Sequence, residues 1–247
     1  MKTDDLIYGI HAVQAALESR ANITELWVEK KRHDQRVEDI IELAKQKSIP
    51  CERVTSHILK EWLPDARHQG VVAKLASIST QNESDLNRLL DSLDEPPFIL
   101  LLDGVTDPHN LGACIRTAEA AGVHAIVVPK DKSCGMTATV RKDASGAAEI
   151  LPFVQVTNLS RCIKALQERG IWFIGTDLVT DTNLYQQDLT GSLAIVMGAE
   201  DKGLRRLTKE HCDTLVKLPM NGTVESLNVS VATGVVLFEA LRQRNKY

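Results

Sequence analysis

The sequence predicts an α/β fold in two domains, and two patterns support that prediction. Apolar runs of strand length alternate with helical segments, which is typical of a parallel sheet covered by helices on both faces. A polar, acidic stretch that ends in Pro96-Pro97 interrupts this alternation once. We therefore expect an N-terminal domain over residues 1–77, a linker over 78–96 and a larger domain over 97–247.

The N-terminal segment has the pattern of a small α/β domain. Its apolar runs over 23–29 and 70–76 are short and have the composition of strands. Between them, the apolar residues of 37–47 recur at helical spacing, which predicts a helix.

The C-terminal segment shows the alternation more strongly. Helices are expected over 111–122 and 159–170, because each apolar pattern ends at a glycine suited to a helix C-terminus. A last helix is expected over about 227–244, with an apolar stripe that suits packing against the sheet or against a partner subunit. The members of that stripe are Leu227, Val231, Val235, Phe238 and Leu241. The expected buried strands are 98–103, 123–129, 171–177, 193–198 and 214–219.

The composition excludes several classes of protein. The chain has 43% hydrophobic residues, and no apolar run reaches the roughly 18 residues of a membrane span, so no membrane association is expected. The N-terminus lacks an export signal, which favours the cytoplasm. Five cysteines without a paired spacing favour neither disulfides nor zinc, and no metal is expected. A net charge of −4 argues against non-specific coating of nucleic acid, although local basic patches can still contact phosphates.

Three loops carry the residues from which we expect function, and two of them lead into helices. The first, over 103–122, makes a turn into a helix with Asn110 in the turn and Arg116 about two turns further on. Asn110 as a mere helix cap and Arg116 as a mere surface charge are the simpler alternatives. The third, over 218–234, brings Ser226, Asn228 and Ser230 together at a helix start, where capping and packing could explain two of the three.

The second loop, over 196–206, follows a buried strand that ends at Gly198. A glycine in that place lets the backbone come close to a ligand, and Glu200 and Gly203 follow it. The spacing of the two glycines is similar to that of a P-loop. However, Leu204 and Arg205 stand where Lys and Ser or Thr are required, so a nucleoside triphosphatase is disfavoured.

In this order the three loops resemble the motifs of the SpoU (TrmH-like) branch of the SPOUT RNA 2′-O-ribose methyltransferases. The matching segments are DPHNLGACIRTAEAAG, VMGAEDKGL and LPMNGTVESLNVSVATG, and the IYGIHAVQAALES start with HQGVVA resembles the substrate-binding domain of that branch. The resemblance implies a C-terminal SPOUT domain with a parallel sheet and a deep trefoil knot. It also implies a small N-terminal α/β (L7Ae/L30e-like) substrate-binding domain, and a homodimer whose interface includes the final helix.

The resemblance implies the site residues one by one. S-adenosylmethionine would bind in the knot, against residues that act mostly through their backbone: Thr176, Gly198, Leu218, Met220 and Leu227. The catalytic set would be Asn110, Arg116, Glu200, Ser226 and Asn228. Apart from the resemblance, the cluster of basic residues makes Lys30, Lys31 and Arg32 of the N-terminal domain candidate contacts to RNA phosphates, with a solvated charged face as the simpler alternative.

The implied reaction is methylation of a guanosine ribose 2′-oxygen in 23S ribosomal RNA. The resemblance gives Arg116 the role of base, but a guanidinium is rarely neutral in a protein, and the same cation could instead stabilise the developing oxyanion, so both roles stay open. Glu200 and Asn110 would position Arg116 and the target ribose, while His109 and His68 are weaker candidates for a base. The alternatives are a tRNA ribose methyltransferase, a catalytically silent rRNA-binding assembly factor and an ordinary α/β nucleotide enzyme.

Overall fold

The computed structural model describes residues 5–18, 22–76, 80–199 and 201–245, and the chain forms two compact units. The first unit holds residues 1–79 together with 136–149, and the second holds 80–135 together with 150–247. Each unit is built around its own sheet, one of four strands and one of six. The α/β class is therefore confirmed in both parts of the chain.

The first unit has a mixed sheet in the order β1-β4-β2-β3. Strand β4 runs antiparallel to β1 and β2, whereas β2 and β3 run parallel. The strands are β1 (Leu6–Tyr8), β2 (Ile23–Glu29), β3 (Cys51–Val54) and β4 (Val71–Leu75), and the helices are α1 (Ile10–Glu18), α2 (Gln35–Gln46) and α3 (Ser56–Trp62). The predicted strands 23–29 and 70–76 are confirmed, as is the predicted helix 37–47 with its start at Gln35.

Alternation along β2 gives this sheet two covered faces. Leu26 and Val28 pack with the buried residues of α1 and α2, while Trp27 points to the opposite face. There the Trp27 ring meets Trp62 of α3 edge to face, with ring centroids 4.8 Å apart. Three helices are thus fixed on a short sheet by alternating side chains.

The segment 136–149 belongs to the first unit although it lies between two strands of the second. It contains α6 (Ala138–Ala144) and the short 3-10 helix η2 (Ala147–Glu149). Arg141 is buried, pairs with Glu149 at 3.0 Å and donates to the carbonyl oxygen of Ala76 at 2.6 Å. A buried guanidinium with these partners holds α6 against the end of β4.

The second unit has a six-stranded sheet in the order β10-β8-β9-β5-β6-β7, and every neighbouring pair is parallel. The predicted parallel sheet is confirmed. Two of the five predicted strands, 98–103 and 193–198, have the expected bounds, and the other three differ from theirs by at most three residues at an end. Strand β7 was not predicted, because its four residues include the polar Gln155 and give too short a pattern. The strands are β5 (Phe98–Asp103), β6 (Ala125–Pro129), β7 (Phe153–Val156), β8 (Trp172–Thr176), β9 (Leu193–Gly198) and β10 (Thr214–Val216).

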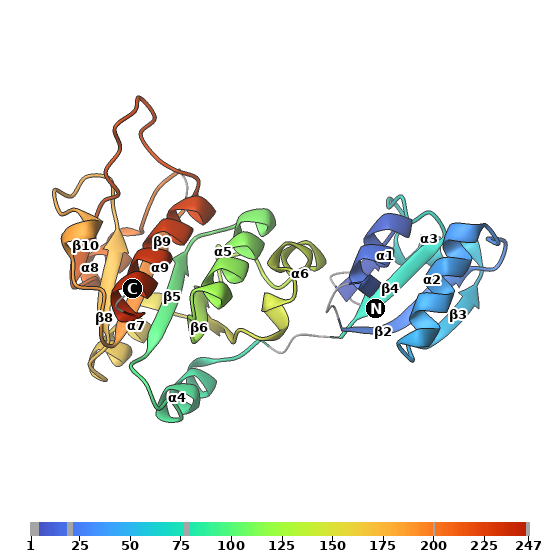
Figure 1. The fold of residues 1–247 in the computed structure, drawn as a ribbon, viewed down its shortest axis with the longest axis horizontal. Helices are drawn as coiled ribbons and strands as arrows, with labels where there is room; N and C mark the ends of the chain where they lie inside the picture. The colour runs from blue at the N-terminus through green and yellow to red at the C-terminus, as the bar shows by residue number, and fades with distance from the viewer. Residues whose placement is uncertain (1–4, 19–21, 77–79, 200, 246–247) are drawn as a thin grey trace. The chain divides into compact units, whose positions relative to one another are not determined.

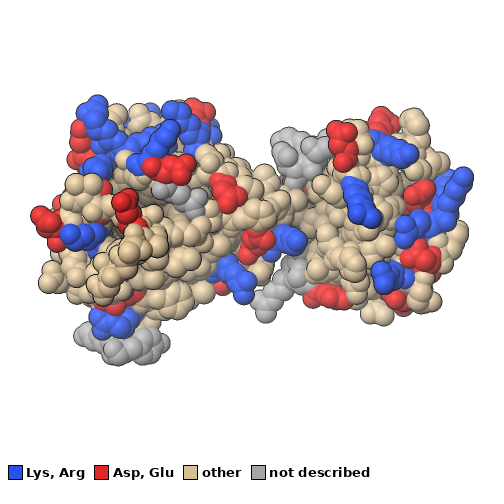
Figure 2. All heavy atoms as spheres, turned by 90° about the horizontal axis from the view of Figure 1, so that it is seen from above, with Lys and Arg blue, Asp and Glu red and all other residues tan. Residues whose placement is uncertain are grey.

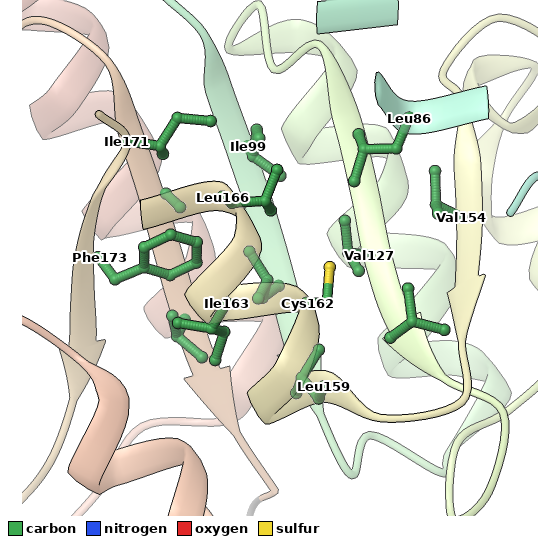
Figure 3. Packing of buried hydrophobic residues seen from close by; sticks show 14 of the residues in the cluster. Leu86, Ile99, Val127, Val154, Leu159, Cys162, Ile163, Leu166, Ile171 and Phe173 are labelled. Carbon is green, nitrogen blue, oxygen red and sulfur yellow. The ribbon is translucent and has the colours of Figure 1, made fainter. Parts of the chain in front are cut away.

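Helices cover both faces of this sheet (Figure 1). On one face α7 buries Leu159, Ile163 and Leu166 over the strands, where they pack in one cluster with Ile99 and Val127 (Figure 3). Burying such a side chain contributes about 2 kcal/mol, so this apolar face fixes α7 on the sheet. Helices α5 and α9 pack together on the other face. The helices and turns are α4 (Glu83–Asp91), α5 (Pro108–Ala120), α7 (Leu159–Gln167), η3 (Leu184–Gln186), α8 (Arg206–His211) and α9 (Val229–Asn245).

The structure bears on two further expectations from the sequence. Residues 80–96, which the sequence places in a linker with a short helix at its centre, lie in the second unit. The short helix is α4, which buries Leu86 and Leu90 in the core cluster that includes Ile99 and Val127. The sequence leaves open whether the apolar stripe of the last helix packs against the sheet or against a partner subunit. Val231 and Phe238 are 53% and 49% exposed, so these two side chains do not pack on the sheet, and the partner subunit stays a prediction. The face of α9 that is buried is instead Val229, Thr233, Val236, Leu237 and Ala240.

The described residues include no helix with the length and hydropathy to cross a membrane. The trefoil knot stays a prediction, because the strand order does not by itself establish how the chain threads.

Candidate active site

A cavity of about 330 Å³ lies where three neighbouring strands end. Strands β10, β8 and β9 are adjacent and parallel, so their carboxyl ends and the loops that follow meet at one edge of the sheet. The start of α9 closes the remaining side. The residues that line the cavity are Thr176, Asp177, Leu178, Val179, Met197, Gly198, Ala199, Asp201, Lys202, Gly203, Lys209, Val216, Lys217, Leu218, Met220, Ser226, Leu227, Val229 and Ala232.

All the residues expected to bind the cofactor lie in the wall of this cavity. Thr176 ends β8, Gly198 ends β9, and the loop after β10 supplies the other three, which are Leu218, Met220 and Leu227. Thr176 is 22 residues from Gly198 and 42 residues from Leu218, and these positions are brought together because β8 pairs with both β9 and β10 in the sheet. What the geometry offers is a largely apolar wall with backbone groups at strand ends.

The turn after β9 needs glycine at two positions. A Cβ on Gly198 would lie 2.1 Å from the carbonyl carbon of Gly203, so no side chain fits there. Gly203 has a φ of +61°, which favours glycine. The turn is closed by two backbone hydrogen bonds between Ala199 and Gly203, of 3.1 and 2.8 Å. Ala199, Asp201, Lys202 and Gly203 of this turn form one side of the cavity.

An ion pair inside the cavity was not expected from the sequence. Lys209 of α8 lies 2.5 Å from the carboxylate of Asp177, which follows β8. Burial by itself raises the pKa of Asp177, but hydrogen bonds from Lys209 and from the backbone N–H of Val179 outweigh it and hold the pKa below its ordinary value. The Asp177 side chain therefore stays charged and fixes α8 against the end of β8. A charged residue directly after an apolar strand was the available signal.

Two of the expected catalytic residues make direct contact. Asn228 donates from Nδ2 to Oδ1 of Asn110 at 3.0 Å, across a separation of 118 residues. Asp107 is the N-cap of α5 and accepts from the backbone N–H of His109, so Asn110 does not serve as that cap. Asn228 also accepts from the backbone N–H and the hydroxyl of Ser230 at the start of α9. The first and third loops are thus joined by one side-chain pair.

The other expected catalytic residues have different surroundings. Ser226 is exposed and lines the cavity, whereas Asn110, Arg116 and Asn228 lie outside its wall. Arg116 is exposed on α5 and makes no ion pair with a described residue. Glu200 lies outside the described residues. Of the two histidines, His109 is exposed in the first turn of α5, and His68 is buried in the first unit and accepts from the backbone N–H of Gly70.

The expected RNA-binding residues follow β2 in the first unit. Lys30 and Lys31 are exposed, but Arg32 is partly buried and pairs with Asp34 at 2.7 Å. Its carbonyl oxygen also accepts from Arg53. Figure 2 shows Lys and Arg side chains interspersed with Asp and Glu on one face of the molecule, rather than a field of one sign. Phosphate contacts in this region would therefore depend on Lys30 and Lys31 more than on Arg32.

The described part of the chain has no group of three or more His, Cys, Asp or Glu side chains arranged to hold a metal ion. All five cysteines are free thiols. Burial raises the pKa of Cys162 to about 12, and burial followed by the nearby charges of Asp213 and Asp103 does the same for Cys212. These thiols are protonated at neutral pH and serve as small apolar side chains.

Comparison with known proteins covers both units. A model of the SpoU rRNA methylase family matches residues 97–238, and a model of the RNA 2′-O ribose methyltransferase substrate-binding domain matches residues 6–81. The chain belongs to the SpoU rRNA methylase family, since that first match covers more than half of its length.

Two relatives that match this chain over nearly its full length carry the same name. A 23S rRNA (guanosine-2′-O-)-methyltransferase RlmB of Shewanella oneidensis is 54% identical over 99% of both chains. A protein of the same name in Escherichia coli K12 is 51% identical over 98% of this chain and 99% of its own. Among solved structures, the SpoU methyltransferase AviRb of Streptomyces viridochromogenes in complex with AdoMet covers 98% of this chain and 91% of its own, with a TM-score of 0.71 and 24% identity. That last likeness supports the fold.

Proposed function

We propose that this chain transfers the methyl group of S-adenosylmethionine to the 2′-oxygen of a guanosine ribose in 23S ribosomal RNA. The observation that carries the proposal is identity of 51–54% to enzymes named for this reaction, over nearly the whole of both chains. Both units are matched by family models, so the likeness includes the substrate-binding part as well as the methylase part.

The cavity at the end of β8, β9 and β10 fits an adenosyl group. Its volume of about 330 Å³ is within the usual range of small-molecule sites. Leu218, Met220 and Leu227 supply apolar surface for the adenine ring, while backbone groups near Thr176 and Gly198 can bond its polar edge. S-adenosylmethionine supplies an electrophilic methyl group on a positively charged sulfur. Binding is therefore assigned to backbone and apolar side chains, as the resemblance implies.

Orientation of the ribose and charge are assigned to residues of the first, second and third loops. A ribose hydroxyl is a poor nucleophile while protonated, so the site must align the oxygen and favour loss of its proton. We assign to Arg116 the stabilisation of the developing oxyanion. One well-placed donor can lower the free energy of such a transition state by about 3 kcal/mol. The Asn110–Asn228 pair holds the first and third loops together, which supports a shared task in placing the ribose. Glu200 is assigned to positioning Arg116, and Ser226 to contact with the substrate.

The remaining parts of the proposal concern partners and place. Lys30 and Lys31, with a smaller share from Arg32, contact RNA phosphates and give affinity that falls with salt. The exposed apolar face of α9, which includes Val231 and Phe238, supports a homodimer formed through this helix. An enzyme that acts on ribosomal RNA belongs in the bacterial cytoplasm, and neither a metal nor a membrane takes part.

The direct test incubates the purified protein with S-adenosylmethionine labelled in the methyl group and with unmodified rRNA and tRNA in separate reactions. The proposal expects label in 23S rRNA, on the 2′-oxygen of one guanosine, as mapped by nuclease digestion and mass spectrometry. Label in tRNA alone would favour the tRNA ribose methyltransferase. Tight RNA binding without bound S-adenosylmethionine and without label would favour a silent assembly factor.

A further inference from the structure

A buried carboxylate lies at the carboxyl end of β5, the strand beside β9. The side chain of Asp103 has 0% of its surface exposed. It accepts from the backbone N–H of Arg205 at 3.0 Å and from Nε of the same residue at 2.6 Å. An ionised carboxylate is costly to bury unless such bonds satisfy it, and bonds between charged groups are about twice as strong as neutral ones.

These bonds fasten the turn that follows β9. Arg205 comes two residues after Gly203, which pairs with Ala199 to close the turn. In the sheet register, Asp103 stands opposite Gly198, the residue at which the turn begins. The carboxylate of Asp103 is thus bonded at the point where the chain leaves the turn, while its backbone is paired with the point where the chain enters it.

The same residue begins the loop that leads to the other expected catalytic groups. Gly104 follows Asp103 with a φ of +92°, and a Cβ built on it would lie 3.5 Å from the Cβ of Ala199 in the turn. From there the chain runs through the N-cap Asp107 into α5, which carries Asn110 and Arg116. Asp103 is therefore the first residue of the first loop, and its side chain is hydrogen-bonded to Arg205 of the second loop.

We propose that Asp103 is a positioning residue of the methyl transfer, acting through Arg205 to hold the turn closed by Ala199 and Gly203 in register with the first loop. The proposal rests on the proposed function, because that turn includes Glu200 in the sequence and forms the Gly198 side of the cavity. Asp103 does not line the cavity. Its effect reaches the reaction only through the residues that the turn carries.

The test is a double-mutant cycle between Asp103→Asn and Glu200→Gln in the full-length protein. We expect Asp103→Asn to lower the single-turnover rate of methyl transfer to 23S rRNA by about 30-fold in the native background, but by less than about 3-fold when Glu200→Gln is present. Because the turn also forms one side of the cavity, the Kd of S-adenosylhomocysteine should rise by about 5-fold with Asp103→Asn. A residue that only stabilises the fold would give equal factors in both backgrounds.

Arg205→Gln keeps the test decisive where Asp103→Asn disturbs folding. This side chain is 43% exposed, and the variant retains the backbone N–H bond to Asp103. It should show the same non-additivity with Glu200→Gln at a smaller amplitude. Arg206→Gln is the matched control. The Arg206 side chain is 78% exposed and, among the ion pairs of the described chain, pairs only with Glu210, so this variant should leave the rate of methyl transfer unchanged.

The outcomes separate this proposal from the one on which it rests. A native protein that transfers no methyl group to 23S rRNA sinks the proposed function. An active native protein in which Asp103→Asn and Arg205→Gln have no effect, or multiply with Glu200→Gln, sinks the role of Asp103 alone. Circular dichroism and the melting temperature of each variant establish that the rates refer to folded protein.

Discussion

The two units use sheets of different kinds, and the difference explains where the site lies. In the second unit all six strands are parallel, so every carboxyl end points to one edge, and the loops after β8, β9 and β10 meet around a cavity of about 330 Å³. In the first unit β4 runs against β1 and β2, and the loops are divided between two edges. A cavity of this unit lies between α1 and α2 instead, and Gln, Asp and Glu side chains make up most of its lining.

This comparison assigns different tasks to the units. A parallel sheet gathers distant segments, which suits chemistry that needs several groups at one point. In the first unit, the exposed Lys30 and Lys31 after β2 suit contact with RNA phosphates. Substitutions in the second unit should therefore change the rate of transfer or the binding of S-adenosylmethionine, while substitutions in the first should change the affinity for RNA.

The largest effect is expected from Arg116→Ala. We expect single-turnover methyl transfer to fall by about 100-fold or more, because the charge that stabilises the developing oxyanion is lost. Binding of S-adenosylhomocysteine should be unchanged, since Arg116 lies outside the cavity wall. Arg161→Ala is a matched control, because that arginine is 66% exposed on α7 and pairs with Glu83.

The form of the Arg116 defect distinguishes its possible roles. A lost base leaves a pH-dependent rate that added guanidine restores, whereas a lost phosphate anchor raises the KM for RNA and spares kcat. A variant that keeps the full turnover rate would remove Arg116 from the chemistry and would weaken the contrast between the units.

The next effect is expected from Gly198→Ala. The added Cβ would meet the backbone of Gly203 at 2.1 Å, so the turn after β9 must move. We expect the Kd of S-adenosylhomocysteine, measured by calorimetry, to rise by about 100-fold, since overpacking of this size typically costs 1–3 kcal/mol or more. Gly135→Ala adds the same methyl group where nothing lies within 4 Å and should leave the Kd alone. An unchanged Kd of S-adenosylhomocysteine in Gly198→Ala would mean that the cofactor does not bind at the end of β9.

A smaller effect is expected from charge reversal in the first unit. Lys30→Glu with Lys31→Glu should weaken binding of 23S rRNA fragments by about 10-fold and reduce the slope of log K against log salt by about 1 to 2. Arg32→Ala should weaken it less, because Arg32 already pairs with Asp34. Lys45→Glu with Lys60→Glu, two exposed lysines of α2 and α3, is the control for net charge. If both double variants lost the same RNA affinity, the region after β2 would have no specific role in RNA binding.

The smallest effect is expected from Glu239→Gln in the last helix, as a pH-dependent change in the melting temperature. Hydrogen bonds from Arg242 and then Gln243 lower the pKa of Glu239 from 4.5 to about 2. A lowered pKa in the folded state stabilises the protein above pH 4.5, and this contribution is lost as the pH falls toward 2. Glu239→Gln should lower the melting temperature by about 2 °C at pH 6, with the difference disappearing near pH 2.

Hydrogen exchange gives a local measure of the same effect. Gln243 accepts from the backbone N–H of Leu189 and donates to Glu239. The Leu189 amide should therefore exchange faster in Glu239→Gln at pH 6, while amides of the first unit stay unchanged. A pH-independent difference between the two proteins would contradict the assigned cause.

The sequence predicted most of the second unit and less of the first. Runs such as 98–103 and 193–198 are apolar at nearly every position, because strands covered on both faces have no polar side to interrupt them. Strands β1 and β3 have three and four residues, too few for a period to emerge. The apolar stripe of the last helix was found, but periodicity cannot tell which apolar face turns inward, and small residues such as Thr233 and Ala240 took that place.

The site residues were predicted from the resemblance of three loops to family motifs, not from the periodicity of apolar residues. The five residues expected to bind the cofactor line one cavity, and their roles stay predictions. What the sequence missed are contacts that arise only when strands become neighbours, such as Asp177 with Lys209 and Asp103 with Arg205. Partners separated by 102 residues leave no local pattern, although a carboxylate that ends an apolar strand was a visible sign in both cases.

The central claim is that the sheet edge formed by β8, β9 and β10 holds the adenosyl group. A crystal structure of the full-length protein with S-adenosylhomocysteine tests it most directly. The account predicts density for the adenine against Leu218, Met220 and Leu227, and none in the first unit. Density at any other place, or an empty edge at saturating ligand, would contradict it.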